Sequence, residues 1–182
     1  MLNARHAVDG EDAVSVIDPK QLRSILGSYA TGVTIVTTVD ACEDPVGVTV
    51  NSFTSVSLEP PLVSWCLRRD SYSLFAFRRS RRYTINVLGS SHKELCARFA
   101  KGSPQKWRGI AYRLGENGCP ILEQAIATVE CKTVGEYDAG DHIILIGEVG
   151  RASAENVAQP LVFFRGRYYQ LNLDTGDAIV AE

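Results

Sequence analysis

The feature that most constrains this chain is a series of short β-rich segments spaced along most of its length. Val, Ile, Thr and aromatic residues fill these segments, and such residues suit the pleated surface of a sheet. We expect strands at 33–39, 46–52, 62–67, 83–88, 127–134 and 142–149, then a hairpin at 161–171. Helical patterns occur only at 18–31, 71–79 and 91–99. Because strands and helices do not alternate, the pattern favours a closed or sandwiched antiparallel sheet with peripheral helices.

Size, composition and charge are those of one ordinary globular domain. With 182 residues, 45% of them hydrophobic, the chain can build a sizeable core. We expect a domain over 18–171, a flexible N-terminal arm at 1–17 and a tail at 172–182. The net charge of −2 gives no basic excess, which argues against nucleic acid or an anionic membrane as a partner. No apolar run is long enough to span a bilayer and the arm lacks the apolar core of a signal peptide, so we expect a cytoplasmic protein.

Cysteine and histidine spacing argues against disulfides and metal ligation. The five cysteines are odd in number, widely spaced and without a Cys-x-x-Cys pair, so we expect reduced, mostly buried thiols. The three histidines, His6, His92 and His142, lie far apart and lack ligand spacing. The sequence also lacks the Gly-x-Gly-x-x-Gly and Gly-x-Ser-x-Gly motifs.

The three helices carry recognisable start and end residues. Asp18 can cap the first helix, which we expect to end at Thr31 before Gly32. Its apolar face would consist of Leu22, Ile25, Leu26 and Tyr29. Ser71 can cap the second helix, and Ser91 with Glu94 forms a capping box for the third.

The stretch from Gly47 to Pro61 is the strongest candidate for a binding segment. It begins as a strand and continues as a run of hydroxyl and amide donors whose only charge is Glu59. Such a run suits a ligand with several acceptors along one edge. Metal ligation or proton transfer would instead require His, Cys, Asp or Glu. The donors are Thr49, Asn51, Ser52, Thr54, Ser55 and Ser57.

Two further constellations leave their alternatives open. His142 follows Asp141 at the mouth of a very apolar strand, so it either contacts a ligand or simply belongs to a turn. Ser71 follows Arg68 and Arg69 and begins a helix, so this stretch is either a phosphate site or an ordinary cap beside solvated arginines. The arginine run at 78–82 is interpreted as a solvated face.

Four stretches, taken together and in this order, resemble the flavin reductase family that serves two-component flavin-dependent monooxygenases. Each alone is a weak motif, but the resemblance extends over 18–171. A flavin ring also has the acceptor-rich edge that the donor run suits. The stretches are Tyr29–Thr37, Thr49–Pro61, Gly140–His142 with Gly147–Val149, and Pro160–Tyr168.

The resemblance implies an FMN-binding split β-barrel of Greek-key type that forms a homodimer. It implies hydride transfer from NADH or NADPH to FAD or FMN, with NADH favoured because no obvious basic pocket awaits a 2′-phosphate. Reduced flavin would then reach a partner monooxygenase by diffusion. A flavin-binding electron carrier without nicotinamide turnover, or an oxidase that keeps its flavin, are the alternatives.

The resemblance also implies roles for individual residues. The backbone of Thr49, Val50, Asn51 and Ser52 would hold the isoalloxazine edge. The loop from Cys66 and Leu67 to Ser71 and Ser73 would hold the ribityl phosphate, and Arg98 and Phe99 would approach the flavin tail. His142 would contact the nicotinamide, with Tyr168 near the same pocket. No metal is implied.

Overall fold

The computed structural model describes residues 17–103, 105–154 and 159–171. The expected tail, and the expected arm apart from its last residue, lie outside this range. Within it the chain forms twelve strands and three α-helices, so it is mainly β, as the sequence predicts. The helices are α1 (Pro19–Leu26), α2 (Leu74–Ser80) and α3 (Lys93–Phe99), and a 3-10 turn, η1 (Ser90–His92), precedes α3.

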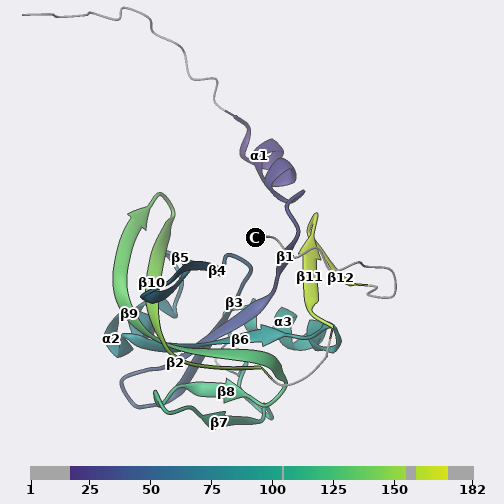
Figure 1. Ribbon diagram of the computed structural model, residues 1–182. Helices are drawn as coiled ribbons and strands as arrows, with labels where there is room; N and C mark the ends of the chain where they lie inside the picture. Colours follow the sequence, from purple (N-terminus) through teal and green to yellow (C-terminus); the bar gives the residue numbers. More distant parts are fainter. Residues whose placement is uncertain (1–16, 104, 155–158, 172–182) are drawn as a thin grey trace, which may run out of the picture.

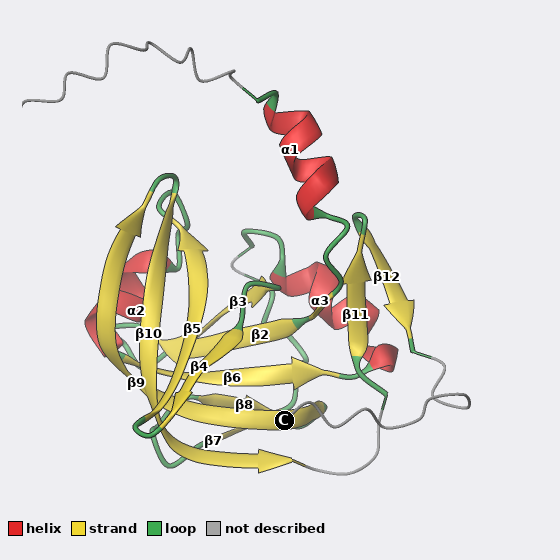
Figure 2. Cartoon of the chain, turned by 45° about the horizontal axis from the view of Figure 1, so that its top comes forward, coloured by secondary structure: helices red, strands yellow, loops and turns green. Residues whose placement is uncertain are grey.

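Seven strands form one curled sheet in which every neighbouring pair is antiparallel. Figure 2 shows β9, β10 and β5 rising together while β2 and β6 cross below them. The two edge strands, β3 and β4, are not hydrogen-bonded to each other, so the sheet is not a closed barrel. In sheet order the strands are β3 (Pro45–Val50), β2 (Thr34–Val39), β6 (Arg82–Leu88), β9 (Ala125–Ala139), β10 (His142–Ala154), β5 (Pro61–Arg68) and β4 (Thr54–Leu58).

Two small sheets complete the fold. One consists of β1 (Thr31–Gly32), β11 (Leu161–Phe164) and β12 (Arg167–Gln170), and the other of β7 (Tyr112–Leu114) and β8 (Pro120–Leu122). The closing hairpin expected at 161–171 is therefore confirmed, with Gly166 in its turn at a φ of 76°. The short strands β1, β4, β7 and β8 were not expected as separate elements, because runs of two to five residues carry little periodic pattern.

The core is divided between the inside of the curled sheet and the side near α3. The first cluster centres on Trp65, whose ring lies edge-on at 4.9 Å from Phe77 and 5.5 Å from Tyr83. The second cluster contains Phe99 and Leu161. The segment 143–146, whose residues are apolar on both faces and therefore indicate a central strand or a subunit interface, lies in β10 between β9 and β5, at the centre of the sheet.

α1 is shorter than expected and has no buried residue. Asp18 caps it as predicted, accepting hydrogen bonds from the backbone N–H groups of Lys20 and Gln21. The expected end at Thr31 is wrong, because the chain leaves the helix at Gly27, whose carbonyl accepts the N–H of Arg165 in the β11–β12 turn. The helix therefore stands clear of the large sheet (Figures 1 and 2). Its apolar side chains, Leu22, Ile25 and Leu26, are exposed, as is Tyr29 beyond it.

The expected caps of the other two helices are wrong. The residue before α2 is Ser73, which makes no side-chain cap bond, and Ser71 lies a turn earlier. η1 takes up Ser91, so α3 begins at Lys93, and the proposed box with Glu94 does not form. In both cases the residue predicted as the cap lies in a turn that precedes the helix. A four-residue sequence motif does not encode such a turn.

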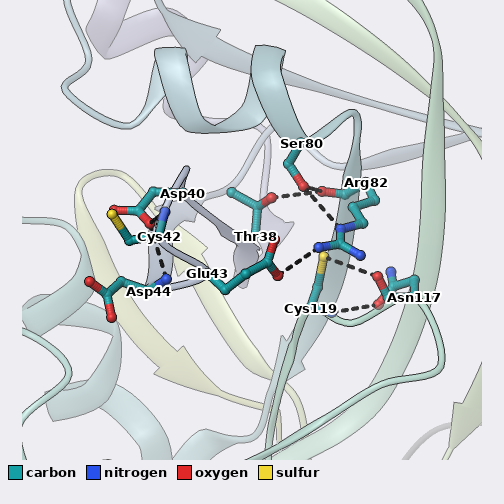
Figure 3. A network of polar contacts seen from close by, with 9 residues as sticks. All are labelled: Thr38, Asp40, Cys42, Glu43, Asp44, Ser80, Arg82, Asn117 and Cys119. Carbon is teal, nitrogen blue, oxygen red and sulfur yellow. Dashed lines mark hydrogen bonds and ion pairs between the residues drawn. The ribbon is translucent and has the colours of Figure 1, made fainter.

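A buried polar network fixes the turn between β7 and β8 to the sheet (Figure 3). The side-chain amide of Asn117 donates to the carbonyl of Tyr83 at 3.0 Å, and its oxygen accepts the N–H of Cys119 at 2.9 Å. The N–H of Asn117 donates to the buried carboxylate of Glu130 at 2.9 Å. This turn is therefore held by side-chain contacts to two different strands.

Arg82, the residue next to Tyr83 on β6, makes a second set of contacts, which reach the β2–β3 turn (Figure 3). The guanidinium of Arg82 donates to Glu43 at 2.8 Å, and its carbonyl accepts the hydroxyl of Thr38 at 2.7 Å. We call this set, from Glu43 through Arg82 to Asn117, the Arg82–Asn117 network.

Candidate functional site

A cavity of about 930 Å³ opens where β3, the end of β5 and the end of α3 meet. This volume lies near the upper end of the range of about 300–1,000 Å³ that small-molecule pockets occupy. It brings together most of the residues that the resemblance singled out: Thr49, Val50, Asn51, Ser52, Cys66, Leu67, Ser71, Ser73, Phe99 and His142. Arg98 and Tyr168 are not among its lining residues.

The backbone between β3 and β4 leaves its donors free at this cavity. β3 ends at Val50 and β4 begins at Thr54, so residues 51–53 belong to no ladder. Among the described residues, no backbone or side-chain acceptor takes the N–H of Asn51, Ser52 or Phe53. Most backbone N–H groups that water cannot reach find a partner within the protein. Asn51 and Ser52 line the cavity, so their free N–H groups can hold acceptors along one edge of a ligand.

The hydroxyl groups of this segment are already used, which corrects the expected role of the donor run. Thr49 donates to the carbonyl of Cys96 in α3 at 2.8 Å. Ser52 accepts the N–H of Cys66 at 2.9 Å and donates to the carbonyl of the same residue at 3.3 Å. The remaining hydroxyl residues of the run, Thr54, Ser55 and Ser57, lie on β4 and do not line the cavity. The ligand-binding capacity of this segment thus lies in its backbone.

The Ser52–Cys66 contact also explains how the open edge of the sheet is held together. β3 and β5 pack against each other without a ladder between them. The paired bonds from Ser52 to the backbone of β5 bridge this gap, which keeps residues 51–53 opposite the end of β5.

The arginines near Ser71 have carboxylate partners. Arg68 pairs with Asp70 at 2.6 Å, and Arg69 pairs with Asp138 at 2.7 Å. The N–H of Ser73 donates to the hydroxyl of Ser71 at 3.3 Å, and Ser73 is largely buried at the cavity wall. The two serines line the cavity together with the Arg68–Asp70 pair, whereas Arg69 pairs with Asp138 outside it.

His142 begins β10 beside the end of β5 and is half exposed at the cavity. Its Nδ1 lies 2.8 Å from the carboxylate of Asp141, and this hydrogen bond lowers the pKa of Asp141. The carbonyl of Asp141 accepts the N–H of Arg69, which ties the turn to the end of β5. The imidazole is thus oriented through Nδ1, and its Nε2 has no protein partner among the described residues.

Arg98 and Tyr168 contact the protein rather than the cavity. The guanidinium of Arg98 donates to the carbonyls of Gln105 and Arg108. The hydroxyl of Tyr168 accepts a hydrogen bond from the thiol of Cys96 at 2.9 Å, and burial raises the pKa of Tyr168 to about 12. Both residues hold α3 to its surroundings, α3 being the helix that supplies Phe99.

Phe99 is buried and forms part of the cavity wall together with Trp107. The two rings meet edge-on at 4.9 Å. Gly47 makes room for them, because a Cβ at this position would lie 2.8 Å from the ring of Phe99.

Sequence reasoning missed Lys101, Lys106 and Trp107 at the cavity because it treated the stretch after α3 as a plain loop. It also gave no role to Tyr72, which lies in the 66–73 loop. An aromatic residue directly after a lysine, as in Lys106-Trp107, was the available indication.

Neither a metal cluster nor a long apolar helix accompanies the cavity in the part of the chain that the structure describes. No group of three or more potential ligand side chains comes together there. None of the helices there is long and apolar enough to cross a bilayer. All five cysteines are free thiols, three of them buried, which confirms the expectation for them.

Comparison with known proteins agrees with the fold. The sequence matches the family described as "Flavin reductase like domain" over residues 26–172. The chain therefore belongs to the flavin reductase-like family, as the four stretches indicated.

Individual relatives extend this comparison. The chain is 40% identical over 166 residues to the reductase subunit of a flavin-dependent monooxygenase from Rhodococcus jostii, covering 91% of this chain and 85% of that protein. The crystal structure of a homologue of nitrilotriacetate monooxygenase component B from Mycobacterium thermoresistibile superposes with a TM-score of 0.85 at 34% identity, covering 90% of this chain and 92% of that one. An NADH:FAD oxidoreductase from Streptomyces globisporus, in complex with NAD and FAD fragments, gives 0.80 at 34% identity, covering 88% and 99%.

Proposed function

We propose that this protein reduces free FAD or FMN with NADH and supplies the reduced flavin to a partner monooxygenase. The observation that carries this proposal is the pair of free N–H groups of Asn51 and Ser52 on the wall of a cavity of about 930 Å³. When both substrates are bound, the nicotinamide C4 hydride passes to flavin N5. This chemistry requires neither a protein nucleophile nor a metal.

The backbone at 49–52 has the main role in binding. Its N–H groups face the acceptor-rich edge of the isoalloxazine, as donors fixed before the reaction begins. Preorganised donors stabilise negative charge that develops during a reaction, and reduced flavin carries such charge. The protein thus favours reduction while it orients the ring.

The serines of the 66–73 loop would hold the ribityl phosphate. Ser71 and Ser73 line the same cavity as the free N–H groups, at the end of β5. The backbone of Cys66 and Leu67 continues this wall. The distribution of donors therefore suits a ligand with a planar head and a phosphorylated tail.

His142 would contact the nicotinamide cofactor. Its Nδ1 is engaged by Asp141, which leaves Nε2 for a ligand amide or phosphate. NADH is favoured over NADPH because the Streptomyces globisporus relative is named an NADH:FAD oxidoreductase. The free Nε2 supports a positioning role for His142 and requires no proton transfer from it.

The assembly is a homodimer of split β-barrels in this proposal, with the domain at 18–171. The curled sheet with β3 packed against β5 supports the barrel, and the exposed apolar face of α1 supports a partner subunit. An isolated helix of eight residues is marginal in water, so α1 benefits from a cover. Light scattering after gel filtration tests the dimer, and a monomeric mass would contradict it.

The enzymatic test is the loss of nicotinamide absorbance in steady state with purified protein. FAD, FMN and riboflavin are each tried with NADH and with NADPH. Turnover that depends on added flavin is the expected result. Flavin binding without turnover for any pair would contradict the reductase and favour an electron carrier, the alternative weighed from the sequence.

A further inference from the structure

The mouth of the cavity carries an aromatic side chain that the protein itself does not cover. Tyr72 is 98% exposed although it lies on the cavity lining. Its ring lies beside the loop that follows α3, since a Cβ at Gly102 in that loop would lie 3.6 Å from its Cδ2. An exposed tyrosine ring offers a flat apolar face with a polar tip, which is a suitable surface for a planar base.

Two lysines in the loop after α3 line the cavity and lack carboxylate partners. Lys101 and Lys106 line it, and neither takes part in an ion pair among the described residues. Five arginines, by contrast, each pair with an aspartate or glutamate: Arg68, Arg69, Arg78, Arg82 and Arg151. Lys106 is also half-buried, and this burial lowers its pKa. A partly desolvated ammonium without an anion is costly, so a negatively charged ligand would stabilise it.

The position of Lys106 is fixed by its neighbours. Arg98 donates to the carbonyls of Gln105 and Arg108, which flank the Lys106-Trp107 pair. Trp107 packs edge-on against Phe99 at 4.9 Å. The lysine is therefore held on the cavity wall by one hydrogen-bonded arginine and one aromatic contact.

We propose that Tyr72, Lys101 and Lys106 form a subsite for the adenosine diphosphate half of a dinucleotide. Tyr72 stacks on the adenine, and the lysines bind the diphosphate. This inference rests on the proposed function, because the free N–H groups of Asn51 and Ser52 are then occupied by the isoalloxazine edge. The ADP half comes from FAD, which would make FAD a better substrate than FMN, or from NADH.

Binding of ADP itself to the full-length protein is the direct test. Isothermal titration calorimetry compares the unchanged protein with Tyr72→Ala and Lys106→Met. Loss of one stacking contact or one diphosphate contact is expected to weaken ADP binding roughly tenfold. Tyr72→Phe retains the ring and should retain the affinity. Tyr137→Ala and Lys93→Met are matched controls, because both residues are exposed and neither lines the cavity.

The outcomes separate clearly. No ADP binding, or equal loss in the control variants, would overturn the subsite. Tyr72 is almost fully exposed, so its removal leaves the fold intact and a loss of binding cannot be attributed to unfolding.

Kinetics then assigns the source of the ADP. The ratio of kcat/KM for FAD to that for FMN, at constant NADH, falls in Tyr72→Ala if the subsite serves the flavin. If the subsite serves the nicotinamide cofactor, the ratio that falls is instead kcat/KM for NADH to kcat/KM for reduced nicotinamide mononucleotide, measured at constant FMN. Equal ratios in Tyr72→Ala and the unchanged protein contradict the subsite but leave the reductase intact. Failure to reduce any flavin contradicts the proposed function itself.

Discussion

The Arg82–Asn117 network and the cavity are both rich in polar groups, but those of the network have partners within the protein and several of those at the cavity do not. In the network, the side chain of Asn117 has partners for both its amide and its oxygen, and Arg82 has a carboxylate. At the cavity, the N–H groups of Asn51 and Ser52 and the ammonium of Lys106 have no protein partner among the described residues. A saturated cluster stabilises the fold, whereas an unsaturated one on a cavity wall has capacity left for a ligand.

The two regions should therefore respond differently to substitution. Changes in the network should lower the free energy of unfolding and leave ligand kinetics intact, while changes at the cavity should act mainly on ligand kinetics. The predictions below test this contrast from its largest expected effect to its smallest.

Asn117→Ala should have the largest effect, a loss of about 3 kcal/mol in the free energy of unfolding. It removes the bonds to the carbonyl of Tyr83 and the N–H of Cys119 and leaves both groups in a part-buried place without partners. Urea unfolding measures it. Asn51→Ala is the matched control, because Asn51 is exposed and its side chain makes no hydrogen bond within the described chain, so its unfolding midpoint should not move. Equal losses in the two variants would remove the contrast.

His142→Ala should raise the KM for NADH roughly tenfold, the effect of losing one good hydrogen bond to the ligand. The KM for flavin should change far less. Steady-state kinetics with each substrate varied in turn measures both. A collapse of flavin affinity with an unchanged KM for NADH would show that the assigned role is wrong.

Ser52→Ala should lower kcat/KM for flavin about fivefold and the free energy of unfolding by about 1 kcal/mol. The substitution removes both bonds to the backbone of Cys66, so the row of N–H groups loses its support across the open edge of the sheet. Ser55→Ala on the neighbouring strand is the control, since its hydroxyl makes no bond in the described part of the chain and does not line the cavity. An equal effect at Ser55 would mean that the bridge is irrelevant.

Glu43→Gln should have the smallest effect, about 0.5 kcal/mol or less. Its pair with Arg82 is short, at 2.8 Å, but the Glu43 side chain is 69% exposed, and exposed ion pairs contribute little. Urea unfolding with and without added salt checks this, because salt should reduce even that small contribution. A loss comparable to that of Asn117→Ala would show that the exposed edge of the network contributes as much as its buried part.

Long periodic segments of the fold were predictable from the sequence. The strands around Ile35, Ile85 and Ile143 were expected because β-branched residues dominate them. The long hairpin of β9 and β10 extends beyond its expected bounds, because Lys, Glu and Arg on its outer positions hide the pattern. The end of α1 and the starts of α2 and α3 were missed because turns, not propensity, fix them.

The sequence motifs predicted only part of the cavity. The stretches at 49–52 and 66–73 do meet there with His142 and Phe99. The sequence does not disclose that Thr49 and Ser52 use their hydroxyls within the fold, since these bonds join residues 47 and 14 positions apart. Lys106 and Tyr72 were missed for the same reason, because only the folded chain brings their two loops to one rim.

The free N–H groups of Asn51 and Ser52 have a consequence for how this protein can diverge. In the proposed site the main chain recognises the ligand, so almost any amino acid at position 51 supplies the same donor, whereas proline deletes it. Position 52 is more constrained, because its hydroxyl also bridges to β5. In a saturation library at position 51, proline should be depleted far more than any other residue. A flavin site of this kind would be hard to lose by mutation and equally hard to recognise from its side chains.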